Sequence, residues 1–138
     1  MNLSNAKVMI CNCDGTMTLD STKLAKACGA EGCCEIATSL CRTETGDLAA
    51  AMRDARDANQ SLLIACTQET SVFDAIAEES ECPSPATVNI RERAGWSDES
   101  ISSTAKIAAL IKQAGDRQAP SRSLALNSDG RCLIYADM

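Results

Sequence analysis

The chain has 138 residues, of which 45% are hydrophobic and 2% aromatic, and its formal net charge is −6. This composition excludes a disordered chain and fits one domain with an aliphatic core. The acidic balance makes nucleic acid a poor partner, because binding to phosphates needs clustered lysines and arginines. The sequence lacks an apolar run of membrane-spanning length, and its first ten residues do not resemble a secretory signal. We therefore expect a cytoplasmic protein with no membrane partner.

The cysteine and histidine contents narrow the chemistry, because the chain has nine cysteines and no histidine. Without histidine, the Ser-His-Asp and Cys-His catalytic schemes and mixed Cys/His zinc sites are excluded. An odd number of cysteines without an export signal makes a disulfide framework a weak interpretation. This cysteine density favours metal or redox chemistry over the packing of cysteine as a small hydrophobic side chain.

Short apolar runs alternate with amphipathic segments along the chain. We expect strands at 7–12, 35–40, 61–66 and 86–92, and helices at 20–29, 43–58, 68–80 and 97–115. Asp20 or Ser21 is the expected N-cap of the first helix, and Gly29 its C-cap. The last helix is expected to bury a stripe of Ile101, Ala105, Ala108 and Ile111. The alternation predicts an α/β fold with three layers, α/β/α, around a small, mostly parallel sheet of about four strands.

The tail differs from the rest of the chain. A polar linker with Pro120 leads to two apolar runs around Asp129 and Gly130, which predict a β-hairpin. We therefore expect residues 1–116 to form the α/β domain and 117–138 to lead toward a following domain of a longer protein. The terminal strand would also allow a homodimer to form by strand addition.

Four cysteines follow the predicted strands. Cys11 and Cys13 come at the end of the first strand, Cys41 follows the second, and Cys66 ends the third. The carboxyl ends of parallel strands lie at one edge of a sheet, where such folds bind ligands. We therefore expect the four thiols to converge there. If the strand continues through Cys13, the side chains of Cys11 and Cys13 point to the same face of the sheet. Helices begin soon after these residues, so their positive ends point to the same edge.

Four thiolates beside backbone N–H donors suit a [4Fe–4S] cluster, because thiolates are soft ligands for iron. A Zn(Cys)4 site is the direct alternative, although the C-x2-C spacing of structural zinc sites is missing. The usual ferredoxin spacing C-x2-C-x2-C-x3-C is missing as well. A third interpretation is thiol chemistry, in which Cys11 and Cys13 or Cys33 and Cys34 form a disulfide or carry a persulfide.

The remaining cysteines have structural interpretations. We expect Cys28 in the core, Cys82 exposed in a turn and Cys132 packed in the terminal hairpin. Cys33 and Cys34 precede the second strand and most simply pack as small side chains. One of them would replace the cysteine after the second strand if that strand were misplaced.

Trp96 is the only tryptophan and follows the fourth strand. We expect it at the same edge as the cysteines, where it either shields a site from water or caps the core. Asp14 and Gly15 indicate a turn. Nucleotide binding has little support, because G-x-G-x-x-G and G-K-[ST] patterns are missing.

The segments "ICNC", "SLC", "IACTQE" and "VNIRERAGW" resemble, in order and at similar intervals, the N-terminal domain found in one of the heterodisulfide reductase subunits. They look even closer to the N-terminal domain of bacterial 4Fe–4S ferredoxin-type proteins built on that theme. The resemblance covers roughly residues 6–112. It implies a domain that binds one [4Fe–4S] cluster and transfers electrons, without being an enzyme itself. The implied partners are other redox domains of a longer chain, or separate electron donors and acceptors.

The resemblance also assigns residues to the site. Its cysteines fall on Cys11, Cys13, Cys41 and Cys66, and its Asn-Ile-Arg-Glu and Trp fall on Asn89, Ile90, Arg91, Glu92 and Trp96. Two stretches depart from the family. Ala94 and Gly95 stand where it often has a cysteine, and "CTQE" replaces its Cys-Ser-Pro-Arg. If that cysteine is a ligand, this chain needs another donor or is a docking domain without a cluster.

Overall fold

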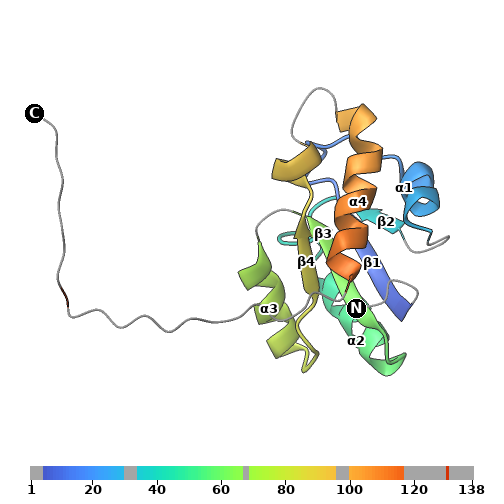
Figure 1. Cartoon of the computed structure of the whole chain (residues 1–138). Coiled ribbons are helices and arrows are strands. Elements are labelled where there is room, and N and C mark those ends of the chain that lie inside the picture. Colours follow the sequence, from blue (N-terminus) through green and yellow to red (C-terminus); the bar gives the residue numbers. More distant parts are fainter. Residues whose placement is uncertain (1–4, 30–33, 67–68, 96–99, 117–129, 131–138) are drawn as a thin grey trace, which may run out of the picture.

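The computed structural model describes residues 5–29, 34–66, 69–95, 100–116 and 130. Strands and helices alternate along the chain, which confirms the predicted α/β class (Figure 1). The strands are β1 (Ala6–Cys11), β2 (Cys34–Ala37), β3 (Ser61–Cys66) and β4 (Ala86–Asn89). The helices are α1 (Ser21–Cys28), α2 (Thr45–Asp57), α3 (Thr70–Glu79) and α4 (Thr104–Gly115), with a π-helical turn η2 (Arg91–Gly95) and a 3-10 turn η3 (Ser100–Ser103).

The four strands form one parallel sheet in the order β2-β1-β3-β4. Helices α1 and α4 cover one face and α2 and α3 cover the other, so the fold has three layers (Figure 1). The chain moves outward from β1 to β2 and then returns to β3 on the opposite side of β1. The winding therefore reverses between β1 and β3. Doubly wound sheets form their ligand crevice at such a reversal, beyond the carboxyl ends of the strands.

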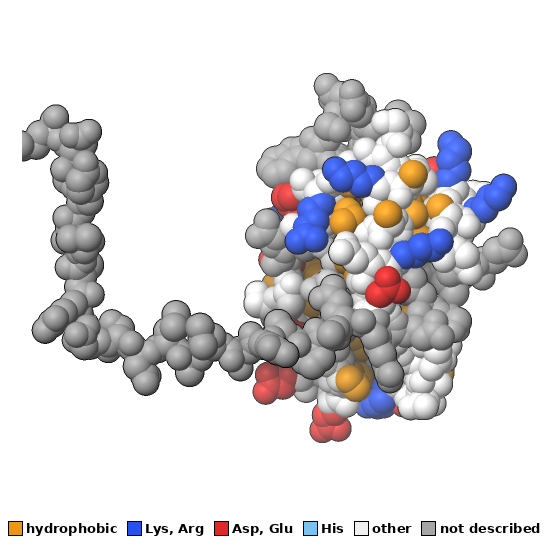
Figure 2. Space-filling view, viewed as in Figure 1, with side chains coloured by type: hydrophobic (Ala, Val, Ile, Leu, Met, Phe, Trp, Pro, Cys, Tyr) orange, Lys and Arg blue, Asp and Glu red, His pale blue; other side chains and the backbone are white. Residues whose placement is uncertain are grey.

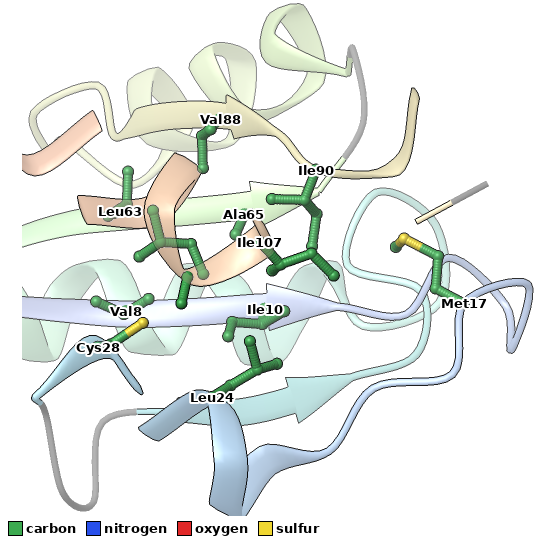
Figure 3. Close-up of a cluster of buried hydrophobic side chains, with 12 residues drawn as sticks. Val8, Ile10, Met17, Leu24, Cys28, Leu63, Ala65, Val88, Ile90 and Ile107 are labelled. Carbon is green, nitrogen blue, oxygen red and sulfur yellow. The ribbon is translucent and has the colours of Figure 1, made fainter. Parts of the chain in front are cut away.

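Successive side chains of each strand enter two different hydrophobic layers. On β1, Val8 and Ile10 face α1 and α4, whereas Met9 and Cys11 face α2 and α3. Figure 3 shows the first of these layers, in which Met17, from the loop after β1, lies at the carboxyl end of the strands. Burial on both faces explains why the strands are almost continuously apolar. It also places the Cys11 side chain in the layer of α2 and α3.

Helix α1 begins and ends as the sequence predicts. The Asp20 carboxylate accepts a hydrogen bond from Lys23 N at 2.9 Å and forms an ion pair with Lys23 Nζ at 3.1 Å. The backbone N–H of Lys23 is the main cause that lowers the pKa of Asp20. Gly29 ends the helix in a left-handed conformation, with φ of 70°. Glycine suits this position because it has no Cβ to clash with the backbone.

The buried face of α4 differs from the predicted stripe. Ile107, Ala108 and Ile111 are buried, whereas Ala105 is exposed. The predicted stripe assumed one α-helix from 97 to 115, but the 3-10 turn η3 precedes α4 and has a different number of residues per turn. Within α4, Ile107 and Ile111 are four positions apart and share one face with Ala108, so the buried face centres on the two isoleucines. The burial of Ile101 lies outside what the structure describes.

Three cysteines outside the predicted site test the expectations for packing. Cys28 is buried, as predicted. Cys82 is half-buried and its Sγ donates to Ser80 O at 3.3 Å, so the prediction of an exposed thiol is wrong. It packs against the layer of α2 and α3, because the turn after α3 folds back toward the sheet. Cys34, predicted in a loop, is the first residue of β2 and lies at the opposite end of that strand from Cys41.

Several predicted features fall outside the described residues. They are Trp96, Cys33, Cys132 and the linker and hairpin of 117–138, apart from Gly130. Expectations for these residues therefore stay predictions. Among the helices that the structure does describe, none combines the length and apolar character needed to cross a bilayer.

Charged side chains are distributed unevenly between the two helical layers. Within their bounds, α1 and α4 carry four lysines and no carboxylate, whereas α2 and α3 carry six carboxylates and two arginines. Figure 2 shows Lys and Arg side chains on the face that α1 and α4 cover. This acidic protein therefore has one basic helical layer.

Phe73 provides a test of the layer formed by α2 and α3, because its side chain is 0% exposed. We expect Phe73→Ala to lower the free energy of unfolding by about 3–5 kcal/mol, through lost burial and the cavity left behind. The measurement is urea denaturation followed by circular dichroism. The control is Ser71→Ala at an exposed position of the same helix, which should change stability little. A loss below about 1 kcal/mol for Phe73→Ala would contradict this packing.

Candidate functional site

The last row of the sheet brings two cysteines together. In the order of the strands, this row contains Ala37, Cys11, Cys66 and Asn89. Ile10 pairs with Ala65, so Cys11 and Cys66 are the next residues on two neighbouring parallel strands. Both side chains enter the layer of α2 and α3, and both residues are almost fully buried. The two thiols therefore lie side by side where the winding of the fold reverses.

The Cys11 thiol has donors on several sides. The Cys66 thiol is the largest cause that lowers the pKa of Cys11, from the ordinary 9.0 to about 6. Backbone hydrogen bonds from Leu40 and Cys13 add to this effect, and the Cys13 N–H lies 3.4 Å from Cys11 Sγ. Burial opposes the shift. When protonated, Cys11 Sγ donates to Thr38 O at 3.3 Å. The surroundings favour the thiolate near neutral pH.

The chain makes a left-handed turn soon after β1. Cys13 has φ of 54° and Asp14 of 58°, a region that residues with a Cβ seldom adopt. Asp14 N donates to Thr38 O at 2.7 Å, and the Thr16 hydroxyl donates to Cys13 O at 2.7 Å. These bonds hold a backbone conformation that costs on the order of 1–3 kcal/mol per residue.

This turn corrects the expected geometry of Cys-x-Cys. The strand ends at Cys11, so Cys13 does not share its side by strand alternation. Cys13 packs instead against the layer of α1 and α4, whereas Cys11 belongs to the layer of α2 and α3. Both residues nevertheless line the same pocket, which they reach from opposite faces of the sheet.

The loop after β2 carries Cys41 toward the same place. The Glu44 carboxylate accepts hydrogen bonds from Thr38 N at 2.8 Å and Ser39 N at 2.6 Å. A further bond joins Glu44 N to Ser39 O at 3.1 Å. Because these contacts fix the loop at the start of α2, Cys41 has a defined position beside the end of the sheet.

Cys41 differs from Cys11 in acidity. Burial is the main cause that raises the pKa of Cys41, and the negative charges of Glu69 and Cys11 add to it. The site therefore combines one thiol that ionises readily with one that keeps its proton.

All four predicted cysteines line one pocket of about 270 Å³. The other lining residues are Asp14, Thr16, Ser39, Arg42, Glu69 and Arg91. The volume lies at the lower limit for small-molecule sites, which suits a compact group better than a nucleotide. Two arginines and two carboxylates balance before any thiol ionises. The structure thus brings together Cys11, Cys13, Cys41 and Cys66, while Trp96 lies outside the described residues.

The segment that the resemblance identified after β4 forms one wall of this pocket. Arg91 lines it, and its Nη1 lies 3.4 Å from Glu92 Oε1. Glu92 N donates to Asn89 Oδ1 at 3.2 Å, which fixes the start of η2. Ile90 is fully buried in the core. Of these residues, Arg91 alone is a lining residue, and Ile90 has a packing role.

Sequence reasoning did not single out Arg42, Glu69, Thr16 or Ser39. These residues lie within three positions of a predicted cysteine or, for Glu69, directly before α3. The only available signal was this proximity along the chain. Polar residues in such loops face either solvent or the site, and the strand pattern does not distinguish the two.

The thiols surround a space and do not converge on one point. Among the described residues, no three His, Cys, Asp or Glu side chains are close enough to hold a single metal ion. In a Zn(Cys)4 site, each sulfur lies about 2.3 Å from the same ion. The described thiols therefore line a shared space and are not arranged around one ion.

A second cavity of about 290 Å³ lies between α2, β1 and β2. Its floor includes Met9, Ile36 and Leu40, and its rim includes Asp47 and Asp54. No thiol lines it. The pocket with the four cysteines therefore contains the greater concentration of chemically reactive groups.

In comparisons with protein-family models, curated proteins and solved structures, nothing matches this chain. The resemblance to heterodisulfide reductase and ferredoxin-type domains therefore stays a prediction. The functional interpretation rests on the pocket and its side chains.

The acidity of Cys11 predicts how stability depends on pH. The pKa of Cys11 is about 6 in the folded protein and ordinarily 9.0, so between these pH values the unfolded chain binds more protons than the folded chain. Stability of the metal-free, reduced protein should therefore rise from about pH 6 to 9, and the gain should be lost as pH falls through 6. Cys66→Ala removes the main cause and should flatten this rise.

The measurement is the urea midpoint at several pH values across this range. Cys82→Ala is the matched control, because it removes a half-buried thiol that does not line the pocket. The stability of Cys82→Ala should rise with pH by as much as that of the unmodified protein. Equal slopes for Cys66→Ala and Cys82→Ala would contradict the interaction between Cys11 and Cys66.

Proposed function

We propose that this chain is an electron-transfer module that binds a [4Fe–4S] cluster through Cys11, Cys13, Cys41 and Cys66. The observation that carries the proposal is the meeting of four thiols, two at the ends of strands β1 and β3 and two in the loops after β1 and β2, around one compact pocket. That pocket lies beyond the carboxyl ends of the strands, at the reversal between β1 and β3. When bound, such a cluster supplies a redox centre whose potential the surrounding protein tunes.

The donor set supports this proposal. Metal ligation requires deprotonated cysteine, and Cys11 has a pKa of about 6, so it offers a thiolate at neutral pH. Cys41 keeps its proton in the metal-free protein, and a coordinated metal ion removes the proton from a thiol. We therefore expect Cys11 to bind first and Cys41 to complete the site with release of a proton.

The surroundings of Cys11 support an anionic sulfur. Arg42 and Arg91 line the pocket together with Asp14 and Glu69, so these side-chain charges balance before any thiol ionises. The Cys13 N–H already points at Cys11 Sγ, and hydrogen bonds to sulfur are one means by which proteins tune such a centre. Cys11 is 1% exposed and Cys66 2%, so this part of the pocket excludes most water.

The departure from the family at Ala94 does not remove a lining residue. Ala94 packs against the layer of α1 and α4 and is not one of the residues that line the pocket. Four thiols line it without a cysteine at this position. This arrangement favours a cluster-binding domain over a docking domain that has lost its cluster.

Reconstitution under anaerobic conditions tests the proposal. We expect the reduced protein to bind about four iron and four sulfide ions and to turn brown, because each of the four thiolates ligates one iron. The measurements are iron and sulfide analysis and an electron paramagnetic resonance spectrum after reduction. Cys11→Ser, Cys13→Ser, Cys41→Ser and Cys66→Ser should each lower the bound iron severalfold.

Cys82→Ser is the matched control, because Cys82 is half-buried and does not line the pocket. Its iron content should equal that of the unmodified protein. The proposal fails if the unmodified protein binds no iron, or if Cys11→Ser and Cys66→Ser bind as much iron as the control. One zinc ion per chain under the same conditions would support the zinc alternative instead.

A further inference from the structure

Cys11 and Cys66 are neighbours in the last row of the sheet, whereas Cys13 of the Cys-x-Cys segment lies beyond the end of β1. Their strands are neighbours, and the preceding residues, Ile10 and Ala65, are paired in register. Both side chains enter the same hydrophobic layer. The register of the sheet therefore holds the two side chains side by side without any rearrangement of loops.

The spacing of the two strands is compatible with a disulfide between these residues. Neighbouring strands lie about 4.7–4.9 Å apart. Disulfides join residues whose Cα atoms are usually about 4.4–6.8 Å apart. Adjacent positions on β1 and β3 fall inside this range. Both side chains leave the sheet on the same face, and closing the bond also requires the two Cβ atoms to come within about 3.5–4.5 Å of each other.

The other two thiols of the pocket are less suited to this reaction. Cys13 belongs to the left-handed turn and packs on the opposite face of the sheet from Cys11. Cys41 is carried by the loop between β2 and α2, which the bonds of Glu44 hold in place. Neither residue is a neighbour of Cys11 in the rows of the sheet.

We propose that Cys11 and Cys66 are a cross-strand dithiol that closes to a disulfide by exchange with a small aliphatic disulfide. The Cys11 thiolate attacks one sulfur of the reagent, whose S–S bond breaks and releases one thiolate. The Cys66 sulfur then attacks Cys11 Sγ and releases the second thiolate, which takes up the Cys66 proton. One disulfide is reduced to two thiols, and two protein thiols are oxidised to one disulfide.

Both residues line the pocket and are almost fully buried, so the exchange requires local opening of the pocket to admit the small reagent. The exchange itself needs no metal and does not depend on the proposed cluster. One consequence does rest on the proposed function. The disulfide occupies two of the four proposed ligands, so oxidation and iron loading exclude one another.

Disulfide mapping of the metal-free protein tests this proposal. Bis(2-hydroxyethyl) disulfide is the reagent, remaining thiols are alkylated, and trypsin is used without reduction. Cleavage yields peptides 8–23, 27–42 and 57–91, which contain Cys11 and Cys13, Cys41 with three others, and Cys66 and Cys82. In a Cys13→Ala/Cys82→Ala background, a link between 8–23 and 57–91 can join only Cys11 and Cys66.

We expect this linked peptide, with the loss of two hydrogen atoms from the intact protein. Adding Cys66→Ala should abolish the link and leave a mixed disulfide on Cys11. Fragmentation of the linked peptides from the unmodified chain should identify the same pair without any substitution. A link from 8–23 to 27–42 in its place, or a persistent mixed disulfide with no link, would overturn the proposal.

Iron loading separates this result from the test of the proposed function. The mapping uses no iron, so its failure leaves the reconstitution result unchanged. A disulfide in a protein that cannot bind iron supports the dithiol and contradicts the cluster. If both hold, pre-oxidised protein should bind at least fivefold less iron than reduced protein, and dithiothreitol should restore binding. Equal iron in oxidised and reduced protein would overturn the mutual exclusion.

Discussion

The register of the parallel sheet determines the geometry of the site. In a parallel sheet, the carboxyl ends of all strands lie at the same edge. The pairing of Ile10 with Ala65 makes Cys11 and Cys66 neighbours in the last row of the sheet at that edge. Alternation along each strand then directs both thiols to the layer of α2 and α3. The loops after β1 and β2 add Cys13 and Cys41 to a position that the sheet has already defined. A shift of one residue between β1 and β3 would place these two thiols on opposite faces.

Backbone strain and a thiol with a lowered pKa occur together at the edge of the sheet where the strands end. Cys13 and Asp14 adopt left-handed conformations, and the N–H of Cys13 lies beside the Cys11 sulfur. The same turn therefore ends the strand, carries a second thiol to the other side of the pocket and stabilises a thiolate. Backbone strain of this kind persists where surrounding bonds determine the conformation, as the bonds to Thr38 O and Cys13 O do here.

The fold and the meeting of the cysteines could be predicted because strand periodicity and parallel order depend on the sequence pattern. The cap of α1 by Asp20 was also predictable, since capping chemistry is local. The turn at Asp14 and Gly15 was predictable, but its start at Cys13 was not, because a cysteine does not indicate a positive φ and the hydrogen bond from Asp14 N to Thr38 O in the loop after β2 helps to maintain it. The phase of α4 and the packing of Cys82 likewise depend on tertiary contacts that a single segment does not reveal. The pairing of Cys11 with Cys66 needed the strand order, because the two residues are far apart in the sequence.

The distribution of charge between the helical layers gives the domain an electric dipole moment. The lysines of α1 and α4 lie on one side of the sheet and the carboxylates of α2 and α3 on the other. The net charge of −6 of the whole chain describes its field only at distances larger than the molecule. At closer range, the field of the dipole rotates an approaching charged molecule before contact. A charged molecule close to the layer of α1 and α4 therefore meets a more positive surface than one close to the layer of α2 and α3, and salt screens this difference over about 8 Å.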